Sequence, residues 1–139
     1  MKILAVDYGL ARTGVAVSDA TGTIATPLDC IPSRNEDRML ETLLGVIEKT
    51  KPEKIIVGLP LRTDMRRSEM ADKVTAFCER LRAETDADIE LCNEMFTTVI
   101  ASQLLHQNEK KSKEQRRLID SAAAAVLLQG YLDKTKQTT

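Results

Sequence analysis

The sequence predicts an α/β fold, a mixed five-stranded sheet whose first three strands form an antiparallel meander, with helices on both faces. Two observations predict it. Apolar runs with strand character follow one another closely at the start of the chain and are joined by short turn-forming segments. Further strands then alternate with amphipathic helical segments, which is typical of βα units. Without a repeat or a linker, the 139 residues are expected to form one domain, 1–139.

The elements are placed by the spacing of apolar residues, which recur at every second position in strands and three or four apart in helices. The expected strands are residues 3–7, 13–18, 23–31, 54–59 and 89–92. The expected helices run from a cap at Ser33 or Asn35 to Lys51, from about Arg66 to Leu81, from Thr97 or Thr98 to about Leu105, and from about Arg116 to Lys134.

Turn-forming residues separate these elements. Residues 19–22 are typical of a hairpin turn that ends in a glycine at positive φ. Pro27 predicts that the third strand lies at an edge, since proline has no N–H for a central ladder. The wholly apolar strand 54–59 predicts a central, parallel position. Residues 107–115 are polar and lysine-rich, and are expected to form a loop.

The composition is that of an ordinary globular protein, with 42% hydrophobic and 29% charged residues. The formal net charge of −1 gives no general attraction to nucleic acid, so such a contact would need a local basic patch. Cys30, Cys78 and Cys92 form no CxxC pair and are interpreted as buried thiols of a cytoplasmic protein. No signal-peptide-like leader and no apolar run of about 20 residues is present, so no membrane partner is expected. The lone His106 argues against zinc.

Three acids are expected to meet at one end of the sheet. Asp7 ends the first strand and Glu94 follows the fifth, so both would share one crevice if these strands are parallel neighbours. Asp120 lies on a helical stripe with apolar residues such as Ala124 and Leu127, and is therefore expected to face the sheet. Two carboxylates about 4 Å apart repel by roughly 4 kcal/mol at a surface-like dielectric, so bridging cations are needed.

Oxygen ligands without His or Cys favour Mg²⁺ or Mn²⁺. Two such ions roughly 3.5–4 Å apart can activate a water and stabilise the leaving oxygen of a phosphodiester. The sequence therefore predicts a two-ion site in which Asp7, Glu94 and Asp120 are metal ligands and catalytic residues, with Asp7 bridging the ions. Each acid alone has another interpretation: a turn former at Asp7, a helix-dipole partner at Glu94 and a helix N-cap at Asp120-Ser121.

Motifs along nearly the whole chain resemble one known family. They are Asp7-Tyr8-Gly9, residues 13–18, the VGLPL segment at 57–61, Asn93-Glu94 with Thr97-Thr98, and residues 119–129. In this order they resemble the YqgF (RuvX) family, whose members are named Holliday junction resolvases or pre-16S rRNA nucleases. The resemblance implies an RNase H-like fold and divalent-metal nuclease chemistry at the same three acids. The residues expected to support the site are Gly9, Thr97, Thr98 and Ser121.

The chain departs from the family pattern in two places. The family usually reads Asp-Glu-Arg where this chain has Asn93-Glu94-Met95, so the acid is kept while a flanking acid and an arginine that could touch phosphate are lost. The loop after Pro60 usually carries Asn and Gly, and here it carries Arg62, Arg66 and Arg67. These arginines are expected to compensate as phosphate contacts.

The expected function is hydrolysis of nucleic-acid phosphodiesters, with 5′-end processing of pre-16S rRNA first and structured RNA as the partner. The expected phosphate contacts are Arg12, Arg62, Arg66, Arg67, Lys110, Lys111 and Lys113, although the lysines could equally form a solvated loop. The alternative is resolution of branched DNA, which needs the same metal pair but two sites, hence a homodimer rather than a monomer.

Two further interpretations remain open. An Asp-x-Gly turn between strands also occurs in sugar kinases and actin-like ATPases, which need two such domains and a second phosphate loop. The other is a non-catalytic nucleic-acid-binding module with a relict site, which the changes at Asn93 and Met95 would favour.

Overall fold

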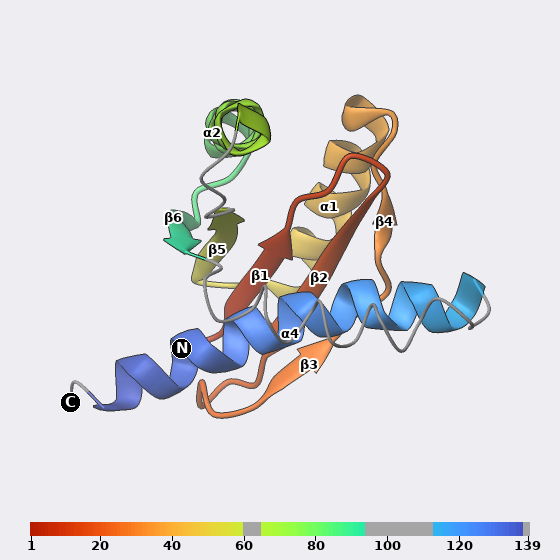
Figure 1. Ribbon diagram of the computed structural model, residues 1–139. Helices are drawn as coiled ribbons and strands as arrows, with labels where there is room; N and C mark the ends of the chain where they lie inside the picture. Colours follow the sequence, from red (N-terminus) through yellow and green to blue (C-terminus); the bar gives the residue numbers. More distant parts are fainter. Residues whose placement is uncertain (60–64, 94–112, 138–139) are drawn as a thin grey trace.

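The computed structural model describes residues 1–59, 65–93 and 113–137, and the side chains at 1–58, 69–92 and 122–135. In chain order the elements are β1 (Ile3–Asp7), β2 (Arg12–Ser18), β3 (Ala25–Pro27), β4 (Ile31–Pro32), α1 (Glu36–Thr50), β5 (Lys54–Leu59), α2 (Met65–Glu84), β6 (Asp88–Asn93) and α4 (Lys113–Gln137). One mixed sheet lies between two helical layers, with α1 and α2 on one face and α4 on the other (Figure 1).

The sheet has six strands in the described residues, rather than five, because the third predicted strand is split. β3 pairs with the end of β2 through Ser18 and Ala25, while β4 pairs with its beginning through Thr13 and Ile31. Between the two, the N–H of Leu28 still donates to the Val15 carbonyl at 2.8 Å. The break follows Pro27, which has no N–H to continue the ladder.

The strand order β3-β2-β1-β5-β6 corrects one expectation that matters for the site. The first strand and the strand before Glu94 are not neighbours, because β5 lies between them and pairs in parallel with both. Ile55, Ile56 and Val57 of β5 are all fully buried. A strand that is apolar on both faces takes the central position, since helices cover it on either side.

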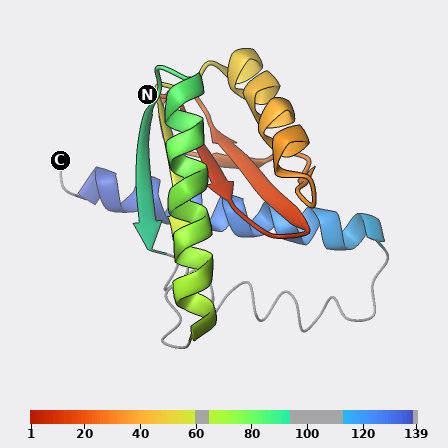
Figure 2. The ribbon, with the colours of Figure 1, turned by 90° about the horizontal axis from the view of Figure 1, so that it is seen from above.

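Two apolar layers hold the helices on the sheet. Alternation along β1 turns Leu4 and Val6 toward α1 and α2, and Ile3 and Ala5 toward α4. The helical residues buried on the first face are Met39, Leu40, Leu43, Val74, Phe77, Cys78 and Leu81. Those buried on the second are Ala124, Leu127, Leu128 and Leu132. Seen from above in Figure 2, α1 and α2 lie over the sheet and α4 crosses beneath it.

The predicted end of α1 and the predicted hairpin turn are confirmed. Asn35 caps α1 by accepting the N–H of Arg38 at 3.2 Å, which settles the choice between Ser33 and Asn35. The helix ends at Thr50 and is capped by Lys51, which adopts the left-handed conformation at φ 50° just before Pro52. In the hairpin turn, Gly22 has φ 69°.

Helix α4 begins earlier than expected, at Lys113. Residues 113–115 are therefore helical, and Asp120-Ser121 lie inside the helix rather than at its N-cap. The helix expected from Thr97 or Thr98 to Leu105, and the rest of the expected loop, lie outside the described residues. No helix in the described part of the chain is long and apolar enough to cross a membrane.

Candidate nuclease site

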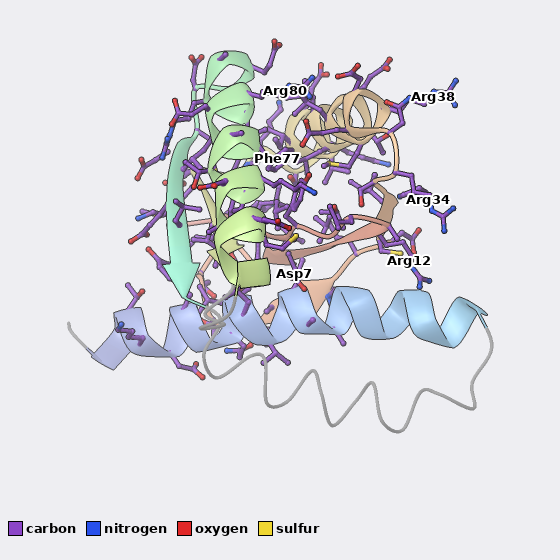
Figure 3. The ribbon with its side chains drawn as sticks, turned by 45° about the horizontal axis from the view of Figure 1, so that its top comes forward. Asp7, Arg12, Arg34, Arg38, Phe77 and Arg80 are labelled. Carbon is purple, nitrogen blue, oxygen red and sulfur yellow. The ribbon has the colours of Figure 1, made fainter. Side chains whose placement is uncertain are left out.

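Asp7 lies at the carboxyl end of β1 and is partly exposed. Because it follows Ile3 and Ala5 at every second position, it lies on the face of the sheet that α4 covers. Figure 3 draws its side chain between the beginning of α2 and α4. The strand therefore delivers a carboxylate to the edge of the sheet where parallel strands end, as the sequence predicts.

The surroundings of two strand-ending aspartates differ. Asp19, after β2, accepts the N–H groups of Thr23 and Ile24 at 2.7 and 3.1 Å and the hydroxyl of Thr21, and these bonds lower its pKa to about 2. Within the described residues, no hydrogen bond or ion pair engages the Asp7 carboxylate. No described N–H group of the turn therefore supports the interpretation of Asp7 as a turn former.

The segment between β1 and β2 is closed by its own backbone and by the loop before α1. The N–H of Gly9 donates to the Thr13 hydroxyl at 3.4 Å. Ser33 donates its hydroxyl to the Gly9 carbonyl at 2.5 Å and its N–H to the Ala11 carbonyl at 3.0 Å. A Cβ at Gly9 would lie 2.1 Å from the carbonyl oxygen of Arg12, so only glycine fits this turn. The expected supporting role of Gly9 thus has a steric basis.

Tyr8 anchors the end of β1 to both helices on the opposite face. Its hydroxyl donates to Glu36 at 3.0 Å, and its ring centre lies 5.1 Å from that of Phe77. Arg80 of α2 donates to Glu36 and to Asp37, each at 2.6 Å. Burial and the bond to Glu36 raise the pKa of Tyr8 to about 12, so the phenol stays neutral. No local sequence pattern indicates this contact, because Tyr8 and Glu36 are 28 positions apart.

Asp120 lies on the part of α4 whose backbone is described. It is one helical turn before Ala124, which is fully buried against the sheet, and its side chain lies outside the described residues, so its expected direction stays a prediction. Glu94 follows Asn93, the last residue of β6, and lies outside the described residues. Among the described residues, no group of three or more His, Cys, Asp and Glu could hold a metal ion.

The ladder fixes the spacing between β1 and β6. Val6 pairs with Val57, and Val57 pairs with Leu91, so Asp7 is level with Gly58 and Cys92 in the neighbouring strands. With β5 between them, the backbones of β1 and β6 are about 10 Å apart. A carboxylate on each strand would therefore flank the end of β5 rather than touch directly.

The chemistry of the described groups near Asp7 fits a hard cation better than zinc. Cys92 packs on the α4 side of the sheet, where burial raises the pKa of its thiol to about 11. Without a metal, the thiol is therefore neutral near neutral pH. The Asp7 carboxylate supplies the hard oxygen ligands that Mg²⁺ and Mn²⁺ prefer, whereas structural zinc sites are built mainly from sulfur and nitrogen.

The expected phosphate contacts fall into three groups. Arg12 begins β2 at the same end of the sheet as Asp7. Arg66 and Arg67 lie in the first turn of α2, and Lys113 begins α4, all as backbone positions. Those outside the described residues are Arg62, Lys110 and Lys111, as are the supporting Thr97 and Thr98. Ser121 lies within α4. Two exposed arginines that the sequence did not single out, Arg34 and Arg38, lie on the same side of the molecule as Arg12, with Arg34 between the other two (Figure 3).

Comparison with known proteins decides the family. The model of a family described as "RuvX: Holliday junction resolvase" matches residues 1–134. The chain belongs to the RuvX family. Two relatives of this RuvX chain, both named "Putative pre-16S rRNA nuclease", come from Phocaeicola vulgatus and a Sulfurihydrogenibium species. The first is 36% identical over 138 residues, covering 97% of each chain. The second is 40% identical over 135 residues, covering 96% of this chain and 90% of the relative.

Solved structures confirm the fold. The RuvC of T. thermophilus, in complex with a Holliday junction substrate, superposes with a TM-score of 0.63 at 17% identity, covering 100% of the RuvX chain and 98% of RuvC. The resolvase of fowlpox virus, in complex with junction DNA, gives a TM-score of 0.60 at 14% identity, covering 97% and 99%. The RuvX chain therefore has the RNase H-like fold of these resolvases.

Proposed function

We propose that this RuvX-family chain is a divalent-metal-dependent nuclease that processes the 5′ end of pre-16S rRNA in the cytoplasm. The observation that carries the proposal is Asp7, a carboxylate at the carboxyl end of a parallel strand that no described group engages. The names of full-length relatives at 36% and 40% identity support the reaction and the substrate.

The proposed ligand set is Asp7, Glu94 and Asp120. Asp7 lies on the α4 side of the sheet, and Asp120 comes one helical turn before Ala124, which is buried on that side. Glu94 comes two residues after Cys92, which packs on that same side, and lies outside the described residues. The spacing of about 10 Å between the backbones of β1 and β6 suits two ions roughly 4 Å apart better than one shared ion.

Bound Mg²⁺ or Mn²⁺ would supply a more acidic water and neutralise charge on the scissile phosphate. The chain's own residues have other tasks in this proposal. Tyr8 and Gly9 fix the backbone on the C-terminal side of Asp7. Positively charged side chains hold the phosphate backbone in register without reading sequence. They are Arg12, Arg62, Arg66, Arg67, Lys111 and Lys113, with Thr97, Thr98 and Ser121 as supporting residues.

Replacing the strand-ending acid tests the proposal. We expect Asp7→Asn to lower Mg²⁺-dependent cleavage of a 5′-extended 16S rRNA precursor by more than about a hundredfold, because changes to residues that merely support metal ligands already cost 10–100-fold. Asp72→Asn is the matched control, since Asp72 is an exposed aspartate on α2. Mn²⁺ binding, followed by calorimetry, should weaken in the first variant and not in the second. Equal cleavage by Asp7→Asn and the wild type would overturn the proposal.

Junction resolution is the second candidate, because the matching family is described as a Holliday junction resolvase. It predicts metal-dependent paired incisions in a four-way DNA junction and a homodimer carrying two sites. The same protein preparations should be assayed on RNA precursor and DNA junction side by side, with light scattering to give the oligomeric state. Cleavage of the junction alone by a dimer would favour this candidate over rRNA processing.

A further inference from the structure

Two exposed arginines differ from the other described arginines of the helical layer in how they are paired. Arg80 pairs with Glu36 and Asp37, and Arg82 pairs with Glu79. Arg34 and Arg38 are exposed, and no described residue forms an ion pair or a side-chain hydrogen bond with either. An exposed guanidinium without a partner in the fold keeps its five donors available for an external anion.

Hydrogen bonds hold the backbone that carries these two arginines. Arg34 follows Ser33, whose two hydrogen bonds tie its loop to the carbonyls of Gly9 and Ala11. Arg38 lies in the first turn of α1, where its N–H is held by the Asn35 cap. The backbone at Arg34 is therefore held by the contacts that close the turn after Asp7, and the backbone at Arg38 by the cap of α1.

Arg12 is the third arginine of this group. It pairs with Pro32 in the ladder between β2 and β4, and Pro32 precedes Arg34 by two residues in the chain. Figure 3 shows Arg12, Arg34 and Arg38 along one side of the molecule, with Asp7 nearer its middle. We call this row of three residues the arginine edge.

The acids closest in sequence do not cancel the arginine edge. Glu36 and Asp37 lie in the same turn of α1 as Arg38, but both carboxylates accept hydrogen bonds from Arg80 at 2.6 Å. The single charge of Arg80 thus offsets one of these two negative charges. The three arginines of the edge therefore face one uncompensated negative charge from this turn of α1.

We propose that the arginine edge binds the phosphate backbone of a nucleic-acid arm that extends away from the site at Asp7. The inference rests on the proposed nuclease function, because the arm belongs to the substrate that is cut. Guanidinium groups match phosphate oxygens in a bidentate geometry, and contacts to phosphates position a substrate without reading its bases. An RNA hairpin arm and an arm of a DNA junction present the same phosphates, so both are probed.

The test measures binding apart from cleavage. Asp7→Asn serves as the parent protein, and fluorescence anisotropy gives its affinity for a labelled RNA hairpin and a labelled four-way DNA junction between about 50 and 200 mM salt. We expect Arg34→Gln with Arg38→Gln to lower the slope of log affinity against log salt by about 2, and to weaken binding about tenfold. Arg34→Lys with Arg38→Lys should restore most of the slope, since the charges return.

The matched control is Lys49→Gln with Lys51→Gln. It removes two charges from the other end of α1, where both side chains are exposed, and should leave the slope of the parent unchanged. An equal loss in this control would overturn the inference, because net charge alone would then explain it. No change in the arginine double variant, or no binding by the parent at the lowest salt, would overturn it as well.

The two proposals fail separately. Suppose that the affinity of the arginine double variant depends less on salt, but the wild type cleaves neither substrate. This result would support phosphate binding at the arginine edge and overturn the proposed nuclease function. A loss seen with RNA alone assigns the edge to an RNA arm, and a loss seen with the junction alone assigns it to DNA.

Discussion

Gly9 shows how one missing side chain positions a candidate catalytic residue. Two residues after Asp7, the chain turns so tightly that a Cβ at this position would meet the Arg12 carbonyl oxygen at 2.1 Å. The obstacle is backbone rather than a flexible side chain, so it cannot move aside without opening the turn. The carbonyl of Gly9 is also the acceptor for Ser33, which links the turn to the loop that carries Arg34.

We expect Gly9→Ala to lower the free energy of unfolding by about 1–3 kcal/mol, as overpacking does elsewhere, and to reduce nuclease activity by displacing Asp7. Urea titration followed by circular dichroism measures the first effect. Gly45→Ala is the control. Gly45 lies in α1 with no atom within 4 Å of its added Cβ, so alanine there should raise stability by about 0.5–1 kcal/mol. A Gly9→Ala variant as stable as wild type would contradict the steric argument.

At the scale of elements, the clamp formed by Tyr8, Glu36 and Arg80 joins β1, α1 and α2. The titration of the Tyr8 hydroxyl reports whether this clamp forms. Burial, and then the hydrogen bond to Glu36, raise the pKa of Tyr8 from 10.0 to about 12. Since the folded chain holds this proton more tightly than the unfolded chain, the stability it contributes is fully present below pH 10. That stability is lost as the pH rises toward 12.

The ultraviolet absorbance of tyrosinate checks this prediction. The chain has only two tyrosines, so Tyr131→Phe leaves Tyr8 as the single chromophore. We expect its midpoint near pH 12 and expect Glu36→Gln to lower it, because one cause of the shift is then removed. A midpoint near 10 in the folded Tyr131→Phe variant would show that the clamp does not form.

The elements also show which parts of the fold the sequence can predict. Apolar spacing is a local signal, so it placed β1, β2, β5 and α1 close to their observed bounds, and the Asn35 cap was among the predicted residues. Strand order depends on which surfaces bury one another, and the assumption that β1 adjoins β6 was wrong for that reason. Pro27 correctly indicated an interruption and an edge position, but the split into two strands was not predicted, because the apolar pattern continues to Ile31.

The candidate site was predictable to the same extent. Asp7 stood out because an acid at the end of a buried strand is costly without a partner. Tyr8 did not, since its partner is distant in the chain, and Arg34 and Arg38 resemble ordinary solvated residues. Only their position on the same side of the molecule as Arg12, and the pairing of Glu36 and Asp37 with Arg80, distinguish them.

At the scale of the whole molecule, α4 is the sole described helix on its face of the sheet and packs on β1, β2 and β3. Leu128 is fully buried there. We expect Leu128→Ala to cost about 2–5 kcal/mol of unfolding free energy, and to destabilise both layers together because they share one sheet. Leu10→Ala, at an exposed position, should change stability by less than about 0.5 kcal/mol.

The two tyrosines make this cooperativity measurable. Tyr8 lies in the layer of α1 and α2, and Tyr131 lies in the layer of α4. In each single-tyrosine variant, Tyr131→Phe and Tyr8→Phe, the urea midpoint from fluorescence should equal that from circular dichroism, and Leu128→Ala should shift both fluorescence midpoints by similar amounts. A shift in the α4 reporter alone would show that the two layers unfold independently.

The central position of β5 also governs how the molecule tolerates change. The interval across β1, β5 and β6 is set by backbone hydrogen bonding, in which side-chain identity plays little part. Insertions or deletions beyond the ends of these strands would therefore leave that interval intact. The connecting segments can then change to contact nucleic acids of different shapes, while the distance between the backbones of β1 and β6 stays constant.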